Sequence, residues 1–446
     1  MGKEFFGTDG IRGVPGMPPL DDATLYATGR SLGAYLKREH GAAHVLIGMD
    51  TRESGPDIAS TLAAGLGQAG ATVAFAGVIT TPGVACLVRQ NDFHAGVVIS
   101  ASHNPFQDNG VKLFSHAGMK FPDSVEEELE AGILKHRGEA AKNLPPLAPD
   151  ESLDAEYLTF LRKRFIPGAK LTGFRIVLDC ANGAAYKLGP ELFRSLGAEV
   201  VAMAVSPDGR NINAGCGSLH LEGLQKCVVA EKARLGVAFD GDADRALFVC
   251  ESGRIVNGDG VLLAAARFLK SQNKLKGDRV VATSMSNLGL ERVLARENIA
   301  LARAAVGDRY VLEEMLRSGN VLGGEQSGHI IFLDDSPAGD GLLTAAKIAS
   351  LVSMHGKIES LVEGLKDYPQ LIVNVKVRSK PPLETLPEVS RALAEAQSAL
   401  GDNGRVVLRY SGTEQLARVM VEAEHEADVQ RFSQSLANAL RSSIGA

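Results

Sequence analysis

Short apolar runs alternate with stretches of helical spacing along most of the chain. The pattern predicts helices at about 22–39 and 56–68 and strands at 45–49, 72–75 and 95–99. Strands and helices follow one another in this way in βαβ units. The first part of the chain is therefore expected to form a sheet covered by helices.

The same pattern returns after a predicted acidic helix at 124–136 and a Pro-rich stretch, NLPPLAPD at 143–150, which is the best candidate for a linker. It predicts strands at 174–178, 200–203, 235–239, 279–283 and 300–304. From about 371 onward the chain alternates apolar and polar residues, as a half-buried antiparallel strand does, and a helix at 383–400 and strands at 404–410 and 416–422 follow. We therefore expect an α/β fold of three consecutive domains with mixed, largely parallel sheets, at 1–150, 151–254 and 255–368. A C-terminal α+β lid domain follows at 369–446, and the active site lies in the central cleft.

The segment ISASHNP at 99–105 places hydroxyl and imidazole groups at the end of a predicted strand. The preceding run AGVVI is continuously apolar, and the Asn-Pro pair prevents its simple continuation. Ser100, Ser102 and His103 therefore emerge at a carboxyl strand end, where open α/β sheets bind ligands. Taken alone, the segment also fits an ordinary Ser/Asn turn that satisfies backbone groups.

A second apolar run, LGVAF at 235–239, leads directly into DGDADR. In an extended segment the side chains of Asp240, Asp242 and Asp244 share one face. Three carboxylates so close repel one another unless a cation lies among them. Mg²⁺ suits such a site, because it binds few carboxylates and keeps positions for water or a phosphate oxygen. Arg245 would then lie beside the ion, and a solvated acidic turn is the simpler alternative.

Two other chemistries use similar segments. With Asp240 as the first position of a calcium-binding loop, Asp242, Asp244 and Glu251 fall at its third, fifth and twelfth positions. Arg245, however, occupies the place of the turn glycine, and the flanks are predicted strands rather than helices. In an aspartyl-phosphate enzyme, Asp240 itself would be the nucleophile and no serine would be needed.

The predicted turn between the last two strands is rich in small and hydroxylated residues. Ser411, Gly412 and Thr413 can direct backbone N–H groups into one concavity, and Arg409 and Arg418 add two guanidinium groups. An ordinary hairpin turn needs neither arginine. We therefore expect a phosphate cradle on a small, mobile lid.

The formal net charge of −6 argues against a nucleic-acid partner but allows a small anionic substrate bound by local cations. Candidate cations in Gly-rich or turn-rich stretches are Arg12, Lys112, Arg245, Arg309, Arg409 and Arg418. No run approaches the roughly 18 apolar residues that span a bilayer, and the N-terminus has neither a signal core nor a myristoylation motif. We expect a cytosolic protein without a membrane partner. Five scattered cysteines predict neither a disulfide framework nor a zinc site.

Five motifs, in order, resemble those of the α-D-phosphohexomutase superfamily, and most closely its bacterial phosphoglucosamine branch. They are FGTDGIRG at 6–13, ISASHNP at 99–105, DGDADR at 240–245, GEQSGH at 324–329 and RYSGTE at 409–414 with Arg418. They resemble, respectively, the opening, phosphoserine, metal, sugar-binding and phosphate-binding loops of that superfamily. VGDRYV at 306–311 resembles the phosphoglucosamine branch. Each of the four expected domains thus carries at least one of these motifs, and the first domain carries two.

The resemblance implies a role for each loop. Ser102 carries the phosphoryl group, and Mg²⁺ is held by Asp240, Asp242, Asp244 and an oxygen of the Ser102 phosphate. Lys112 and His329 are candidates for proton transfer, and Arg245 acts beside them. The implied substrate-binding residues are Arg12, Ser100, His103, Arg309, Glu325, Ser327, Arg409, Ser411, Gly412, Thr413 and Arg418, of which Glu325 and Ser327 hold sugar hydroxyls.

The implied activity is an Mg²⁺-dependent interconversion of glucosamine 6-phosphate and glucosamine 1-phosphate. It passes through a sugar 1,6-bisphosphate, which also serves as activator, and it supplies cell-envelope precursors. The enzyme is expected to be a monomer or a homodimer. Preference for an amino sugar rests chiefly on Gln326, where many hexose mutases carry methionine. The alternatives are a phosphomannomutase or phosphoglucomutase and, more remotely, a sugar-phosphate or calcium-binding module without turnover.

Overall fold

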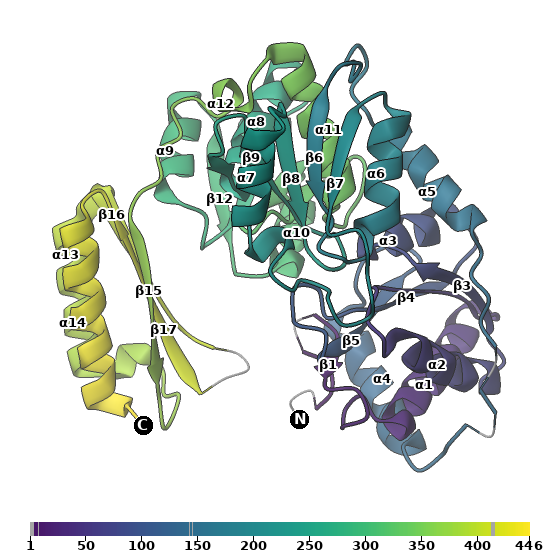
Figure 1. Ribbon diagram of the computed structural model, residues 1–446. Helices are drawn as coiled ribbons and strands as arrows, with labels where there is room; N and C mark the ends of the chain where they lie inside the picture. The colour runs from purple at the N-terminus through teal and green to yellow at the C-terminus, as the bar shows by residue number, and fades with distance from the viewer. Residues whose placement is uncertain (1–3, 8, 142, 145, 412–414) are drawn as a thin grey trace. The chain divides into compact units, whose positions relative to one another are not determined.

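The computed structural model describes residues 4–7, 9–141, 143–144, 146–411 and 415–446 (Figure 1). The chain divides into two compact units. Unit 1 comprises Met1–Thr283 and Ala304–Glu363, and unit 2 comprises Ser284–Arg303 and Gly364–Ala446. Among the described helices, none combines the length and the apolar character needed to cross a bilayer.

The first sheet of unit 1 has the strand order β1-β5-β4-β2-β3. Its strands are β1 (Ile11–Gly13), β2 (His44–Met49), β3 (Thr72–Val78), β4 (Ala95–Ile99) and β5 (Asn109–Ser115). β2 pairs in parallel with β3 and β4, whereas β5 pairs antiparallel with β4 and β1. All five residues of β4 are buried, as expected for a central strand built from a continuous apolar run.

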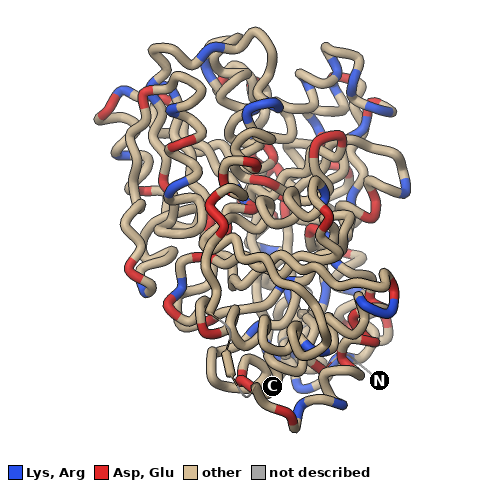
Figure 2. Tube along the Cα trace, turned by 90° about the vertical axis from the view of Figure 1, so that its right-hand side faces the viewer, with Lys and Arg blue, Asp and Glu red and all other residues tan. Residues whose placement is uncertain are grey.

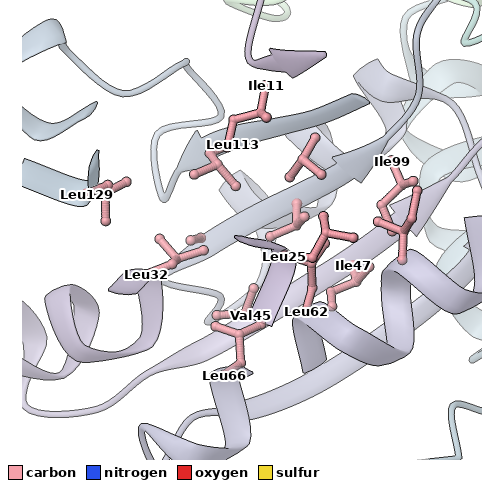
Figure 3. Close-up of a cluster of buried hydrophobic side chains, with 14 of the residues drawn as sticks. Ile11, Leu25, Leu32, Val45, Ile47, Leu62, Leu66, Ile99, Leu113 and Leu129 are labelled. Carbon is pink, nitrogen blue, oxygen red and sulfur yellow. The ribbon is translucent and has the colours of Figure 1, made fainter. Parts of the chain in front are cut away.

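Helices complete the first domain of unit 1. They are α1 (Asp22–His40), α2 (Gly55–Gln68), α3 (Thr81–Gln90) and α4 (Asp123–His136). Leucines from α1, α2 and α4 share one buried cluster with apolar side chains of the sheet, and Figure 3 shows Leu66 beside Val45 and Leu62 beside Ile47. α1 and α2 meet at glycines, since a Cβ on Gly65 would lie 2.1 Å from the carbonyl oxygen of Tyr26. The close helix contact therefore depends on the missing side chain.

The second sheet repeats this arrangement, with the order β10-β9-β8-β6-β7. Its strands are β6 (Arg175–Asp179), β7 (Glu199–Met203), β8 (Leu235–Phe239), β9 (Ala246–Cys250) and β10 (Ile255–Val256). β6 pairs in parallel with β7 and β8, and β9 pairs antiparallel with β8 and β10. Helices α5 (Ser152–Lys163), α6 (Ala185–Ser195) and α7 (Glu222–Ala230) accompany it. Central strands β4 and β8 thus occupy equivalent places in two similar sheets.

The third sheet pairs β11 (Arg279–Thr283) in parallel with β13 (Leu322–Gly324), which pairs antiparallel with β14 (Ile330–Phe332). The remaining helices of unit 1 are α8 (Gly258–Ser271), α10 (Asp308–Ser318), α11 (Gly341–His355) and α12 (Ile358–Leu361). The prediction of mixed, largely parallel α/β sheets is therefore confirmed for this unit.

Unit 2 has an antiparallel sheet in the order β15-β17-β16. Its elements are α9 (Leu288–Arg296), β12 (Ala300–Ala304), β15 (Gln370–Lys376), α13 (Pro387–Leu400), β16 (Gly404–Tyr410), β17 (Leu416–Ala423) and α14 (Glu426–Ile444). Apolar side chains of α13 and α14 pack with those of the sheet. The predicted start of the helix at 383 is wrong: Leu383–Thr385 form a 3₁₀ turn, and the helix begins at Pro387, where the fixed φ of proline suits a first helical position.

Candidate active site

Ser102 lies just after β4, in a conformation that non-glycine residues seldom adopt. Its φ is 53°, and its Oγ donates to Asp240 Oδ2 at 2.6 Å, across 138 residues of sequence. Ser102 N–H donates to Ser100 Oγ at 2.9 Å, and Ser100 Oγ in turn donates to Asp50 Oδ2 at 2.6 Å. His103 Nδ1 lies 3.3 Å from Ser102 Oγ. Burial, followed by the charges of Arg245 and Arg12, lowers the pKa of His103 to about 4, which favours a neutral ring.

The three aspartates lie together for a reason other than the predicted one. The segment after β8 is not extended: Ala243 has a φ of 56°, and its N–H donates to Asp240 O at 3.1 Å. This tight turn, rather than an extended strand, brings one carboxylate oxygen of each of Asp240, Asp242 and Asp244 within 4.8 Å of the others. β8 and β9 flank the turn as strands, so the calcium-loop alternative, which needs helices, is wrong.

The turn offers the carboxylate oxygens that a divalent cation site requires. Oδ1 of Asp242 and Oδ1 of Asp244 are buried, and neither has a hydrogen-bond partner among the described residues. Burial, with the neighbouring Asp244 and Asp242 charges, raises the pKa of Asp240 well above its usual range. A hard cation among these oxygens would coordinate the Oδ1 atoms of Asp242 and Asp244 and relieve the repulsion between the carboxylates. The residues present therefore fit Mg²⁺.

Lys112 on β5 supplies a fixed positive charge to this turn. Its Nζ lies 2.9 Å from Asp242 Oδ2, 3.2 Å from Asp9 Oδ2 and 3.6 Å from Asp244 Oδ2. Burial alone would lower its pKa, but the three carboxylates raise it well above the usual range. Lys112 is therefore a buried ammonium that donates hydrogen bonds. Thr81 Oγ1 also donates to Asp242 Oδ2, at 2.5 Å.

The charges continue beyond Lys112 into a ring that the sequence did not predict. Asp9 lies 2.7 Å from Lys120 Nζ, which lies 2.9 Å from Asp308 Oδ2. Asp308 lies 4.0 Å from His329 Nε2, and His329 Nδ1 lies 3.7 Å from Asp244 Oδ2. Carboxylates therefore alternate around the ring with the basic side chains of Lys112, Lys120 and His329, and the two lysines offset part of the negative charge.

His329 lies inside this ring and is 6% exposed. Burial opposes its charged form, but Asp244, Asp308 and Glu325 raise its pKa to about 9. The backbone N–H of Gly339 nevertheless donates to Nε2 at 3.2 Å, which requires a lone pair there. The two observations favour different protonation states. Because the hydrogen bond is a direct contact, we place the single proton of the His329 imidazole on Nδ1, which faces Asp244, and leave Nε2 unprotonated.

The turn between β13 and β14 carries the predicted sugar-binding residues. Glu325 Oε2 accepts from Ser327 Oγ at 3.2 Å, and Glu325 Oε1 accepts from the N–H of Gly307 at 3.2 Å. Gln326 Nε2 donates to Asp259 Oδ2 at 3.3 Å, so its side chain is held by the start of α8. Glu325 and Ser327 are thus side by side on one turn.

Three predicted arginines of unit 1 occupy different surroundings. Arg12 on β1 donates to Ala101 O at 3.4 Å and pairs with Asp9. Arg245 Nε lies 3.8 Å from Asp244 Oδ1, beside the acidic turn. Arg309 instead forms ion pairs with Asp123 at 2.7 Å and Glu313 at 3.0 Å, so the structure does not bring it to Ser102. Its role in substrate binding stays a prediction.

The predicted phosphate-binding residues lie in unit 2. Arg409 on β16 and Arg418 on β17 are direct partners in the antiparallel register. Burial and the charge of Arg418 lower the pKa of Arg409, as expected for two neighbouring cations. Ser411 is buried, and its carbonyl accepts from Lys380 Nζ at 2.7 Å. Gly412 and Thr413 lie outside the described residues.

Sequence reasoning missed four polar side chains of this site. Asp9 and Asp308 lie within the quoted motifs FGTDGIRG and VGDRYV but received no role. Lys120 and Thr81 carried no local signal, because a lone lysine and a threonine at a helix start are common anywhere. Only the packing of distant segments brings them to the acidic turn. Elsewhere in the chain, Lys and Arg are interspersed with Asp and Glu (Figure 2).

Comparisons with known proteins agree with this arrangement. The chain is 52% identical to the phosphoglucosamine mutase of Solibacter usitatus over 447 residues, which is 100% of both chains. It is 51% identical to that of Koribacter versatilis, over 99% of this chain and 98% of the other. Among solved structures, a phosphoglucomutase/phosphomannomutase family protein from Burkholderia thailandensis matches with a TM-score of 0.80 and 25% identity, over 98% and 97% of the two chains.

Four family profiles also match consecutive parts of the chain. The profiles of phosphoglucomutase/phosphomannomutase alpha/beta/alpha domains I, II and III match residues 3–139, 155–253 and 257–370. The C-terminal domain profile matches residues 372–439. All four domains of that architecture thus occur in order. The chain belongs to the phosphoglucomutase/phosphomannomutase family.

Proposed function

We propose that this phosphohexomutase interconverts glucosamine 6-phosphate and glucosamine 1-phosphate through a phosphorylated Ser102. Two relatives named phosphoglucosamine mutase match it at 52% and 51% identity over nearly the whole chain. The observation that carries the proposal is the 2.6 Å hydrogen bond from Ser102 Oγ to Asp240, at the edge of an acidic turn in which two buried carboxylate oxygens have no hydrogen-bond partner among the described residues.

The reaction explains why a serine and an acidic turn belong together. A phosphate on O6 of a hexose cannot reach O1 across the ring, so the enzyme lends its own phosphoryl group. The P–Oγ bond of phosphoserine breaks as a P–O1 bond forms, O1 loses its proton and the Ser102 oxygen takes one up. In the return step Ser102 Oγ loses its proton and bonds to the phosphorus on O6, the P–O6 bond breaks, O6 is protonated, and the sugar leaves as the 1-phosphate. The bisphosphate also rephosphorylates any enzyme that has lost its phosphate.

Asp240, Asp242 and Asp244 would hold Mg²⁺, which when bound supplies positive charge beside the transferring phosphoryl group. Lys112 contributes a fixed ammonium on the same side, because three carboxylates keep it charged. Arg245 adds a guanidinium next to Asp244. These cations offset the charge of a phosphoserine, which is nearly −2 near neutral pH.

The remaining residues orient the sugar and carry its proton. Glu325 and Ser327, which lie on one turn, form hydrogen bonds with sugar hydroxyls: Glu325 accepts them, and Ser327 can donate or accept. His329, with a lone pair at Nε2, is the candidate proton carrier. Arg409 and Arg418 of unit 2 bind the phosphate that is not reacting, which would relieve the repulsion between them.

A coupled assay tests the substrate. Purified enzyme is given glucosamine, glucose or mannose 6-phosphate with Mg²⁺ and a trace of the matching 1,6-bisphosphate. We expect kcat/KM for glucosamine 6-phosphate to exceed the other two by at least about tenfold, a difference of about 1.4 kcal/mol in transition-state binding. Equal or greater turnover of glucose or mannose 6-phosphate would indicate a phosphoglucomutase or phosphomannomutase. No turnover of any sugar would indicate a binding module.

A further inference from the structure

We infer that Arg52 is a positioning residue that holds the backbone of the Ser102 segment from beneath, together with Asp50 and Asn213. Neither the family comparison nor the sequence motifs assign these three residues a role. The inference rests on the proposed function for its effect on turnover. Its structural part concerns only residues 100–108.

Arg52 uses every N–H donor of its guanidinium group. Nε donates to Asp50 Oδ2 at 2.9 Å, and Nη1 donates to the carbonyls of Asp108, at 2.9 Å, and Pro105. Nη2 donates to the carbonyls of Ser102 at 3.0 Å and Asn104 at 2.9 Å. A guanidinium has five N–H donors, so none is left for another partner. Four of the five acceptors are backbone carbonyls of one short segment.

The arrangement is fully enclosed. The side chains of Arg52 and Asp50 are both 0% exposed. Burying a charged pair is costly unless its hydrogen bonds are complete, and here those of the guanidinium group are complete. An arginine that served only to pair with Asp50 would not need four further acceptors. The geometry is that of a planar fork fitted to the loop that carries Ser102.

Asp50 fixes the backbone N–H of Ser102 through the hydroxyl of Ser100. It accepts from Ser100 Oγ at 2.6 Å, and Ser100 Oγ accepts from Ser102 N–H at 2.9 Å. The N–H of Ser102 is therefore held through Ser100 and Asp50, and its carbonyl is held by Arg52. With both peptide groups fixed, the φ of 53° is maintained and Oγ keeps its direction toward Asp240.

Asn213 reinforces the same carbonyls from the second domain. Its Nδ2 donates to Ser102 O at 2.9 Å and to Asn104 O at 3.1 Å. Gly241 permits this close approach, since a Cβ there would lie 2.4 Å from Ser102 O. Arg52 and Asn213, from different domains, thus both donate to the carbonyls of Ser102 and Asn104, and no described hydrogen bond of either side chain goes to the sugar-binding turn.

This arrangement predicts an effect on turnover rather than on substrate affinity. Ser102 must present its oxygen in the same place before and after each transfer, and a displacement of about 1 Å costs on the order of 100-fold in rate. A lysine at position 52 keeps the charge but offers one ammonium in place of the fork. It can reach Asp50 or the carbonyls of the loop, but not all five acceptors.

The test compares Arg52→Lys with Arg210→Lys in the full-length enzyme. Arg210 is a neighbouring exposed arginine whose Nε donates to Glu53 at 2.7 Å, so its variant is the matched control. For Arg52→Lys we expect kcat to fall about 100-fold, with KM for the sugar phosphate within about threefold of the original enzyme. Hydrogen–deuterium exchange should become faster in peptides covering 100–108 and remain unchanged elsewhere in the first domain. The control should leave both measurements unchanged.

Wild-type kcat in Arg52→Lys, a loss that appears only in KM, or unchanged exchange at 100–108 would overturn the inference. If Arg52→Lys does not fold, Asn213→Ala provides the test. It should lower kcat about tenfold without changing KM and speed exchange in the same peptides, and absence of both effects would overturn the inference. If the original enzyme turns over no sugar phosphate, the proposed function fails, and the exchange measurement alone decides whether Arg52 holds the loop.

Discussion

At the scale of single residues, the site is defined by charges that offset one another in a buried space. Asp240, Asp242 and Asp244 were predictable as a group, because the motif itself places them within five residues. Their geometry was not predictable, since the alternation rule for strands does not apply in a turn where Ala243 has a positive φ. The partners Asp9 and Lys120 also escaped prediction, because only the tertiary fold brings them near Lys112.

Replacing Asp242 tests the metal-binding role of the turn. Asp242→Asn removes one negative charge and one anionic oxygen, while an amide of similar size can still accept from Thr81. We expect the Mg²⁺ concentration for half-maximal activity to rise at least about 10–100-fold, the range found when even an outer partner of a metal ligand is lost. Mg²⁺ titration of the mutase activity, with calorimetric titration of Mg²⁺ alone, measures this.

Asp278→Asn is the matched control, because Asp278 is an exposed acid paired with Lys270 at 3.3 Å. Its Mg²⁺ dependence should equal that of the original enzyme. An unchanged Mg²⁺ dependence in Asp242→Asn would show that the acidic turn does not hold the ion.

At the scale of helices and strands, prediction was most accurate where the apolar pattern was unbroken. The strands Ala95–Ile99 and Leu235–Phe239 match their predicted bounds, because a short, continuously apolar run between turn residues leaves few alternative strand ends. The helix predicted at 383 begins instead at Pro387, since apolar spacing alone does not fix a first turn. The close contact of α1 and α2 at Gly65 had no signal in the spacing pattern, because a glycine inside a helix does not alter the apolar spacing.

Two glycines of α2 give a matched test of that contact. A Cβ added to the buried Gly65 would lie 2.1 Å from Tyr26 O, whereas one added to Gly67 would meet nothing within 4 Å. Gly65→Ala should lower the free energy of unfolding by about 1–3 kcal/mol through overpacking. Gly67→Ala should raise it by up to about 1 kcal/mol, since alanine favours the helix. Urea unfolding measures both, and equal effects would contradict the close packing of α1 on α2.

Asp340, at the N-terminus of α11, gives a prediction about pH. Its carboxylate accepts from Leu343 N at 2.9 Å and from Tyr157 Oη at 2.8 Å, yet it is 1% exposed. Burial raises its pKa from 3.8 to about 6. The folded protein thus holds this proton more tightly than the unfolded chain. The stability from this group is complete below about pH 4 and is lost as the pH rises to about 6.

Asp340→Asn removes that titration and keeps an acceptor for Leu343. Between pH 4 and pH 7, the free energy of unfolding of the original protein should fall by up to about 3 kcal/mol relative to the variant. Asp57→Asn, which changes an exposed acid in the first turn of α2, is the control. If the free energy of unfolding changes with pH in the same way in the original protein and in Asp340→Asn, the raised pKa of Asp340 is contradicted.

At the scale of the whole molecule, the order of four domains could be predicted because each delivers a loop of distinctive composition. The grouping of residues 284–303 with the C-terminal part of the chain could not be predicted from the sequence. Glu422 on β17 accepts from Leu288 N–H at 2.8 Å and pairs with Arg405, and such contacts between distant segments leave no trace in local patterns. The cytosolic location and the monomeric or dimeric state remain predictions.

In the proposed reaction cycle, Ser102 gives its phosphoryl group to the sugar and receives the other phosphoryl group of the bisphosphate in return. The most direct test is a rapid-quench experiment with enzyme carrying ³²P on Ser102 and a slight excess of glucosamine 6-phosphate. We predict that the label leaves Ser102 and appears in glucosamine 1,6-bisphosphate and then in glucosamine 1-phosphate within one turnover, and that Ser102→Ala takes up no label. Label on any other residue, or full turnover by unphosphorylated enzyme without bisphosphate, would contradict the account.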